Sequence, residues 1–185
     1  SRAFAEYADY YLRSDGQRYP LVAQHSGIYL DGYHADIDRA LGHCGSEMIS
    51  ELYVPRAAFA RFMQLAAETL RLHRADPIYG TVRLIERDTV TTLAWAREPW
   101  ACIVFNLHIE HRCNGPLEAA AAFRALIDAA LECGGSFYLT YHRWARPEQL
   151  EAAHPTLRAV LERKRELDPH GIFQSDWYRH LERCL

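Results

Sequence analysis

Residues 101–111 read ACIVFNLHIEH and alternate between two unlike faces, as a β-strand does. One face holds apolar side chains alone: Ile103, Phe105, Leu107 and Ile109. The opposite face carries, in order, Cys102, Val104, Asn106, His108 and Glu110. A strand of this kind lies against a core on its apolar side. The amide, imidazole and carboxylate on the other side need a separate explanation.

Three more segments show strand patterns on either side of this stretch. Residues 48–55 (MISELYVP), 78–86 (IYGTVRLIE) and 136–144 (SFYLTYHRW) alternate in the same way. Residues 56–74 and 117–133 instead place apolar side chains at helical spacing. The order β-α-β-β-α-β predicts an α+β, ferredoxin-like fold, in which two helices cover one face of an antiparallel four-stranded sheet.

This reading divides the chain into three parts. Residues 1–47 are expected to form an N-terminal helix and an irregular segment with one short helix near 32–41. Residues 48–145 form the ferredoxin-like core, and 146–185 form C-terminal helices and a tail that packs on it. The chain begins without methionine and in the middle of a pattern, which suggests a piece of a longer polypeptide.

The composition excludes several classes of protein. With 185 residues, 49% of them hydrophobic, the chain can bury a core, and a net charge of −3 argues against a nucleic-acid surface. No apolar run is long enough to span a membrane. Five cysteines without a CxxC pair favour reduced thiols and a cytoplasmic location. We expect no metal site, because His108 and His111 would point to opposite faces of one strand.

The polar side chains of the four predicted strands fall on one shared face. They are Glu51, Tyr53, Tyr79, Thr81, Arg83, Asn106, His108, Glu110, Tyr138, Thr140 and His142. These groups donate, accept and titrate, as a binding surface requires. Two simpler interpretations remain open: the face is solvated, or it docks another domain. In those cases His108 is a structural residue, and Arg83 pairs with Glu51 or Glu110.

Five segments carry a family resemblance: SEMISELYVPR (46–56), YGTVRLIERD (79–88), WACIVFNLHIEH (100–111), FYLTYHRWA (137–145) and above all LDPHGIFQSDWYRHL (167–181). Together they resemble the C-terminal half of FAD-linked oxidoreductases of the vanillyl-alcohol-oxidase type. The sugar-lactone and alditol oxidases are the nearest branch. The resemblance covers about residues 20–185.

The resemblance implies a flavoenzyme that oxidises a CH–OH group of a sugar, lactone or polyol by hydride transfer to FAD. An N-terminal domain outside this chain would bind most of the FAD, so the fragment alone would be inactive. Arg83 matches the arginine of the E-x-R strand motif of alditol oxidases, but Thr81 stands where that motif has glutamate. The HWxK motif reads here as His142-Arg143-Trp144-Ala145, without the lysine.

The resemblance also implies roles for individual residues. Two histidines are candidate catalytic groups, as base or polariser: His108 and His142. The candidate substrate-binding residues are Arg83, Thr81, Asn106, Tyr53 and Tyr138. The candidate cofactor-binding residues, in a tail that runs beside the flavin, are Gln174, Asp176 and Tyr178. The residues alone do not decide which histidine is the base. The alternative function is a non-enzymatic ferredoxin-like module that binds a ligand or forms a homodimer through its sheet.

Overall fold

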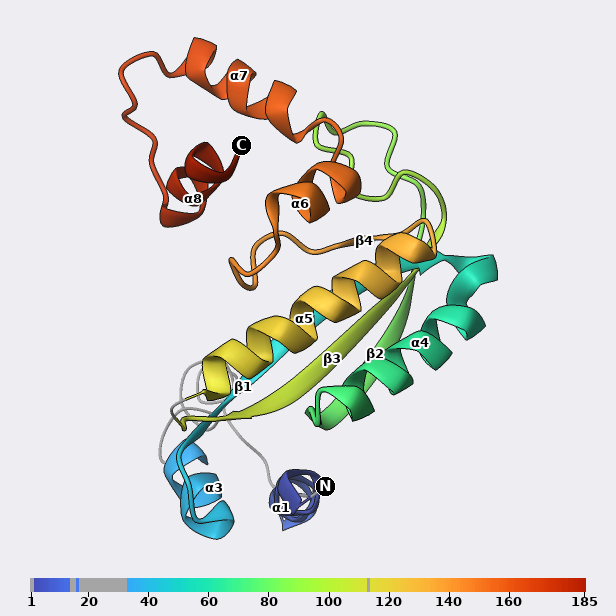
Figure 1. Ribbon diagram of the computed structural model, residues 1–185, viewed down its shortest axis with the longest axis vertical. Helices are drawn as coiled ribbons and strands as arrows, with labels where there is room; N and C mark the ends of the chain where they lie inside the picture. Colours follow the sequence, from blue (N-terminus) through green and yellow to red (C-terminus); the bar gives the residue numbers. More distant parts are fainter. Residues whose placement is uncertain (1, 14–15, 17–32, 113) are drawn as a thin grey trace.

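The computed structural model describes residues 2–13, 16, 33–112 and 114–185 (Figure 1). Its strands are β1 (Gly45–Pro55), β2 (Asp76–Ile85), β3 (Trp100–Glu110) and β4 (Ser136–Phe137). Its helices are α1 (Arg2–Arg13), α3 (Tyr33–Leu41), α4 (Phe59–Leu72), α5 (Gly115–Glu132), α6 (Pro147–Ala153), α7 (Leu157–Leu167) and α8 (Asp176–Cys184), with a 3₁₀ turn η1 (Arg56–Ala58) before α4. Most of the irregular segment expected before residue 32 lies outside the described residues.

The four strands form one antiparallel sheet in the order β2-β3-β1-β4. Helices α4 and α5 lie against one side of it (Figure 1). The predicted α+β, ferredoxin-like fold is therefore confirmed. None of the helices within the described ranges has the length and apolar character needed to span a bilayer.

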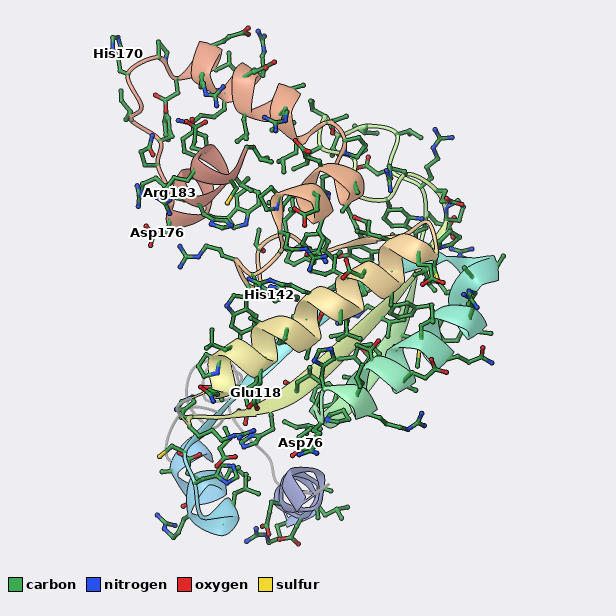
Figure 2. The ribbon with its side chains drawn as sticks, in the orientation of Figure 1. Asp76, Glu118, His142, His170, Asp176 and Arg183 are labelled. Carbon is green, nitrogen blue, oxygen red and sulfur yellow. The ribbon has the colours of Figure 1, made fainter. Side chains whose placement is uncertain are left out.

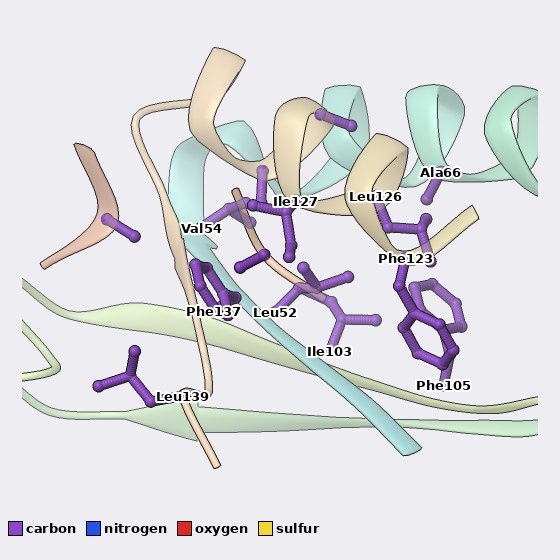
Figure 3. Close-up of a cluster of buried hydrophobic side chains, with 14 of the residues drawn as sticks. Leu52, Val54, Ala66, Ile103, Phe105, Phe123, Leu126, Ile127, Phe137 and Leu139 are labelled. Atoms are coloured by element: carbon purple, nitrogen blue, oxygen red, sulfur yellow. The ribbon is translucent and has the colours of Figure 1, made fainter. Parts of the chain in front are cut away.

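The core fills the space between the sheet and these two helices (Figure 3). Leu52 of β1 lies opposite Ile103 of β3, and both side chains are almost completely buried. Phe62 of α4 and Phe123 of α5 pack onto them and are fully buried. Burying one such side chain stabilises the fold by about 1.5–3 kcal/mol. The apolar face predicted for residues 101–111 is this surface.

The predicted fourth strand is mostly wrong. Only Ser136 and Phe137 pair as a strand, although the amide of Tyr138 still donates to the carbonyl of Glu51 at 2.9 Å. The chain then turns at residues 139–140. The carbonyl of Leu139 accepts a hydrogen bond from Trp177 Nε1 of α8 at 2.9 Å. Packing against α8 and the core thus replaces strand pairing over residues 139–144.

The C-terminal tail folds back on the same region. Asp168 ends α7, and its carboxylate accepts from the amides of Ile172 and Phe173 at 2.8 and 3.0 Å. Ser175 caps α8 by accepting from the amide of Tyr178 at 3.0 Å. Leu181 of α8 is fully buried in the core. Much of the segment 167–181 therefore shapes the connection between α7 and α8.

A buried histidine ties α6 to β4 and should make stability depend on pH. His154 is 5% exposed, and its Nε2 lies 3.0 Å from the carbonyl oxygen of Phe137. Burial lowers the pKa of His154 from 6.5 to about 4. The unfolded chain therefore takes up this proton near pH 6.5, whereas the folded chain does so only near pH 4. Stability is complete above this window and falls as the pH drops through it.

We expect His154 alone to remove about 2 kcal/mol of stability between pH 7 and pH 5. The measurement is urea unfolding of the wild type and of His154→Gln at both pH values. The glutamine amide can still donate to Phe137 but does not titrate, so the variant should show the smaller pH dependence. An equal pH dependence in both proteins would contradict this assignment.

Candidate functional site

The candidate site lies on the sheet face turned away from α4 and α5, which we call the open face. It is formed by Glu47, Ile49, Glu51 and Tyr53 of β1, Tyr79, Thr81, Arg83 and Ile85 of β2, and Cys102, Val104, Asn106 and His108 of β3. The connection 86–99 covers part of this face, since Trp95 contacts the ring of Tyr53 with centroids 4.9 Å apart. The rest of the face carries the polar groups.

The carboxylate of Glu51, in the middle of the open face, accepts hydrogen bonds from three side chains. Glu51 Oε1 accepts a hydrogen bond from the Tyr53 hydroxyl at 2.8 Å and from the Cys102 thiol at 3.2 Å. Glu51 Oε2 accepts from the Tyr141 hydroxyl at 3.2 Å. We call Glu51, Tyr53, Cys102 and Tyr141 the Glu51 cluster. It joins β1, β3 and the turn after β4.

The three donors of the Glu51 cluster stay protonated at neutral pH. Burial and the neighbouring Glu51 raise the pKa of the Cys102 thiol to about 12, and they also raise the pKa of Tyr53 and of Tyr141. Cys102 is therefore a neutral donor and not a nucleophile. A carboxylate offers about four acceptor positions. Three are used, so Glu51 keeps capacity for one further donor.

Arg83 lies beside this cluster. It stands opposite Cys102 in the register of β2 and β3, and its charge acts on both Cys102 and Tyr141. Its side chain is exposed and has no ion pair among the described residues. Pairing of Arg83 with Glu51 or Glu110, the simpler interpretation of its role, is therefore wrong.

Two other predicted substrate contacts lie close by. Thr81 is exposed one pleat away from Arg83 on the same face of β2. The ring of Tyr138 is exposed and contacts the ring of Tyr141, with centroids 4.7 Å apart. The Tyr53 hydroxyl and the Tyr138 amide contact Glu51, whereas Thr81 and Arg83 lie on β2, on the far side of β3 from it. A fixed acceptor beside a free guanidinium and several hydroxyls can hold a ligand rich in hydroxyl groups.

Asn106 and His108 share the open face but lie toward its other end. The six residue steps from Cys102 to His108 span about 20 Å at about 3.3 Å per residue. Asn106 is buried, and its Oδ1 has no hydrogen-bond partner among the described residues. His108 contacts His43 and Glu47 instead of the Glu51 cluster.

His142 does not lie on the open face. Figure 2 shows His142 beside α5. Its ring packs against Phe123 of α5 and stacks on Trp144, with centroids 4.5 and 5.3 Å apart. Burial lowers the pKa of His142 to about 4, so the imidazole is neutral. The alternation that placed His142 beside Arg83 fails because the strand ends at Phe137. The predicted place of His142 on the same face as Arg83, Asn106 and His108 is therefore wrong.

The predicted cofactor contacts have partners within the tail itself. Asp176 forms an ion pair with Arg179, and the ring of Tyr178 lies 4.3 Å from Lys164 Nζ. Gln174 is exposed before α8. Asp176 nevertheless stays exposed at the surface, and no contact within the described residues tests a role beside a flavin, so this role stays a prediction.

Three members of the Glu51 cluster were not predicted as site residues. Glu51 was predicted on the polar face, but only as a partner for Arg83, and Cys102 was placed on that face without a role. Tyr141 gave no signal, because a continuous strand would point it toward the helices. The turn at residues 139–140 is what brings it to Glu51.

Neither the models of known protein families nor the curated proteins give a match to this sequence. Within the described ranges, no three His, Cys, Asp or Glu side chains are placed to hold a metal ion.

Proposed function

We propose that this chain is the substrate-binding cap domain of an FAD-dependent oxidoreductase that oxidises a CH–OH group of a sugar, lactone or polyol. The Glu51 cluster beside the unpaired Arg83 is the observation that carries the proposal. The resemblance of five segments to FAD-linked oxidases supplies the reaction class. A separate domain would hold the FAD, which accepts the hydride when it is bound.

The residues of the open face have distinct tasks in this proposal. Arg83 donates to substrate oxygens, and Thr81 and Tyr138 complete the contacts with neighbouring hydroxyls. Glu51 accepts a hydrogen bond from the hydroxyl group that is oxidised and then takes up the proton of that group. The neutral phenols of Tyr53 and Tyr141 hold the carboxylate in place. The four described cysteines are free, which supports a reducing, cytoplasmic environment.

The test is the visible spectrum of the protein expressed together with the sequence that flanks these residues in its gene. We expect a yellow protein whose flavin bands bleach anaerobically when a sugar lactone or polyol is added. Residues 1–185 alone should be colourless. A colourless longer protein, or a flavin that no CH–OH compound reduces, would overturn the proposal.

A second candidate function, a homodimer formed through the sheet, is favoured by the edge strand β2. Its side chains Val82 and Leu84 point to the helix side but are 52% and 70% exposed. An edge strand with exposed apolar residues can pair with another copy. Sedimentation of residues 1–185 distinguishes the candidates: a dimer that Val82→Lys dissociates supports this function, and a monomer at all concentrations excludes it.

A further inference from the structure

A cavity of about 160 Å³ lies at the end of the sheet far from the Glu51 cluster. It is bounded by the end of β3, the start of α5 and the turn from α4 to β2; Figure 2 labels Asp76 and Glu118 at this end. Its polar walls include His43, His73, Arg74, Asp76, His108 and Arg112. For comparison, a cavity of about 150 Å³ can hold benzene, so a ligand of about six non-hydrogen atoms fits.

Two residues that line the cavity, His43 and His108, belong to a chain of three hydrogen-bonded side chains whose third member is Glu47. Glu47 Oε1 lies 3.3 Å from His108 Nδ1, and His108 Nε2 lies 2.9 Å from His43 Nε2. The side chain of His108 is 4% exposed. Its ring packs directly on Gly45, where a Cβ would lie 2.3 Å from His108 Cε1. A hydrogen bond from His108 Nδ1–H to the Glu47 carboxylate fixes the tautomer and orientation of His108.

Asp76 provides an acceptor without a donor. It lies directly opposite His108 in the pairing of β2 and β3 and lines the cavity. Its Oδ1 is buried and has no hydrogen-bond partner among the described residues. A buried carboxylate oxygen without a donor is costly, so a ligand that donates to it would gain a strong, charge-assisted bond.

The remaining charges of the cavity point to the nature of this donor. Arg112 is paired with both Glu110 and Glu118, so its guanidinium is already engaged and makes no ion pair with Asp76. An ammonium group would give the buried Asp76 oxygen a charged donor.

Arg74 supplies a cation at the same cavity. Arg74 precedes Asp76 by two positions and has a φ of 51°, a conformation that favours glycine. Its side chain makes no ion pair or hydrogen bond among the described residues. A free guanidinium is suited to a carboxylate.

We propose that this cavity binds a small α-amino acid, with its ammonium group on Asp76 and its carboxylate on Arg74. Alanine has the size that the cavity volume allows. The site is separate from the proposed oxidation of an alcohol on the Glu51 cluster, and neither depends on the other. His43 and His108 line the cavity beside the proposed ammonium site, so their ring NMR signals should shift when a ligand binds.

The test is an NMR titration of residues 1–185 that follows the ring signals of His43 and His108. The probes are L-alanine, ethylamine and propionate, which carry both charges, the ammonium alone and the carboxylate alone. We expect alanine to bind most tightly, ethylamine more weakly and propionate not at all. Histidine signals that do not move with alanine, or that move equally with propionate, would overturn the proposal.

Two variants separate the contacts. Asp76→Asn should weaken alanine and ethylamine by about tenfold or more. Arg74→Gly should weaken alanine by about tenfold and leave ethylamine unchanged. Glycine also suits the backbone of residue 74, so this variant should be at least as stable as the wild type. Arg71→Ala, an exposed cation outside the cavity lining, is the control and should bind as the wild type does. Unchanged alanine affinity in Asp76→Asn and Arg74→Gly would contradict the assignment.

Discussion

Glu51→Ala is expected to lower the free energy of unfolding by about 3 kcal/mol. The loss arises because the buried Tyr53 hydroxyl and the Cys102 thiol would both keep their protons but lose their acceptor. Urea unfolding measures the change. Glu86→Ala is the matched control, because Glu86 is exposed and forms a surface ion pair with Arg56, which should contribute at most about 1 kcal/mol.

The more conservative Glu51→Gln separates chemistry from stability. The amide keeps the shape of the side chain, but it cannot take up a proton and offers only one acceptor oxygen. In the longer, flavin-containing protein we expect flavin reduction by the alcohol to slow by about 10²–10⁴-fold, the range for loss of a general base. The fold should remain intact by circular dichroism. A folded Glu51→Gln protein with the wild-type rate would remove Glu51 from the proton transfer.

Gly135→Ala is expected to have the second large effect, a loss of about 3 kcal/mol or more in unfolding free energy. A Cβ at this position would lie 1.9 Å from the carbonyl oxygen of Tyr53 and 2.8 Å from that of Ala130. Both neighbours are backbone atoms of packed elements, so neither can swing aside. The variant would force β4 away from β1 next to the Glu51 cluster. Thermal unfolding of the purified variant measures the effect.

The adjacent Gly134→Ala is the control for this prediction. Gly134 has a φ of 75°, and a Cβ there would meet only Pro55 Cγ, at 3.9 Å. Its replacement should cost about 1–2 kcal/mol, the penalty for a left-handed backbone without steric conflict. If both variants lost equal stability, the requirement for glycine at position 135 would not come from close packing between the end of α5 and β1.

Alternation along the sequence predicted the architecture because three strands are long and pair along most of their length. The apolar residues Ile103, Phe105 and Leu107 face the helices, as their spacing indicated. The same rule failed for residues 138–144. In that segment the chain turns, and the rings of His142 and Trp144 pack on Phe123. Trp177 Nε1 donates a hydrogen bond to the carbonyl of Leu139. That contact comes from a helix 38 residues away in sequence, so no local pattern could reveal it.

The candidate site was predicted in part for the same reason. Arg83, Thr81 and Tyr53 follow from strand alternation and lie together on the open face. Alternation assigns a face but not the register between two strands, so it could not show that Arg83 lies opposite Cys102, about 20 Å along the sheet from His108. Nor could it place Tyr141, which reaches Glu51 only because β4 ends early.

The most direct test of the central claim, that the open face binds the alcohol substrate, is the rate of flavin reduction in the longer protein with Arg83→Leu. Arg87→Leu, the exposed arginine just beyond β2, is the control. Loss of a charge-assisted contact predicts a fall of about 10–100-fold in kcat/KM for Arg83→Leu and no change for Arg87→Leu. Equal values for the wild type and Arg83→Leu would contradict the assignment of the open face as the substrate site.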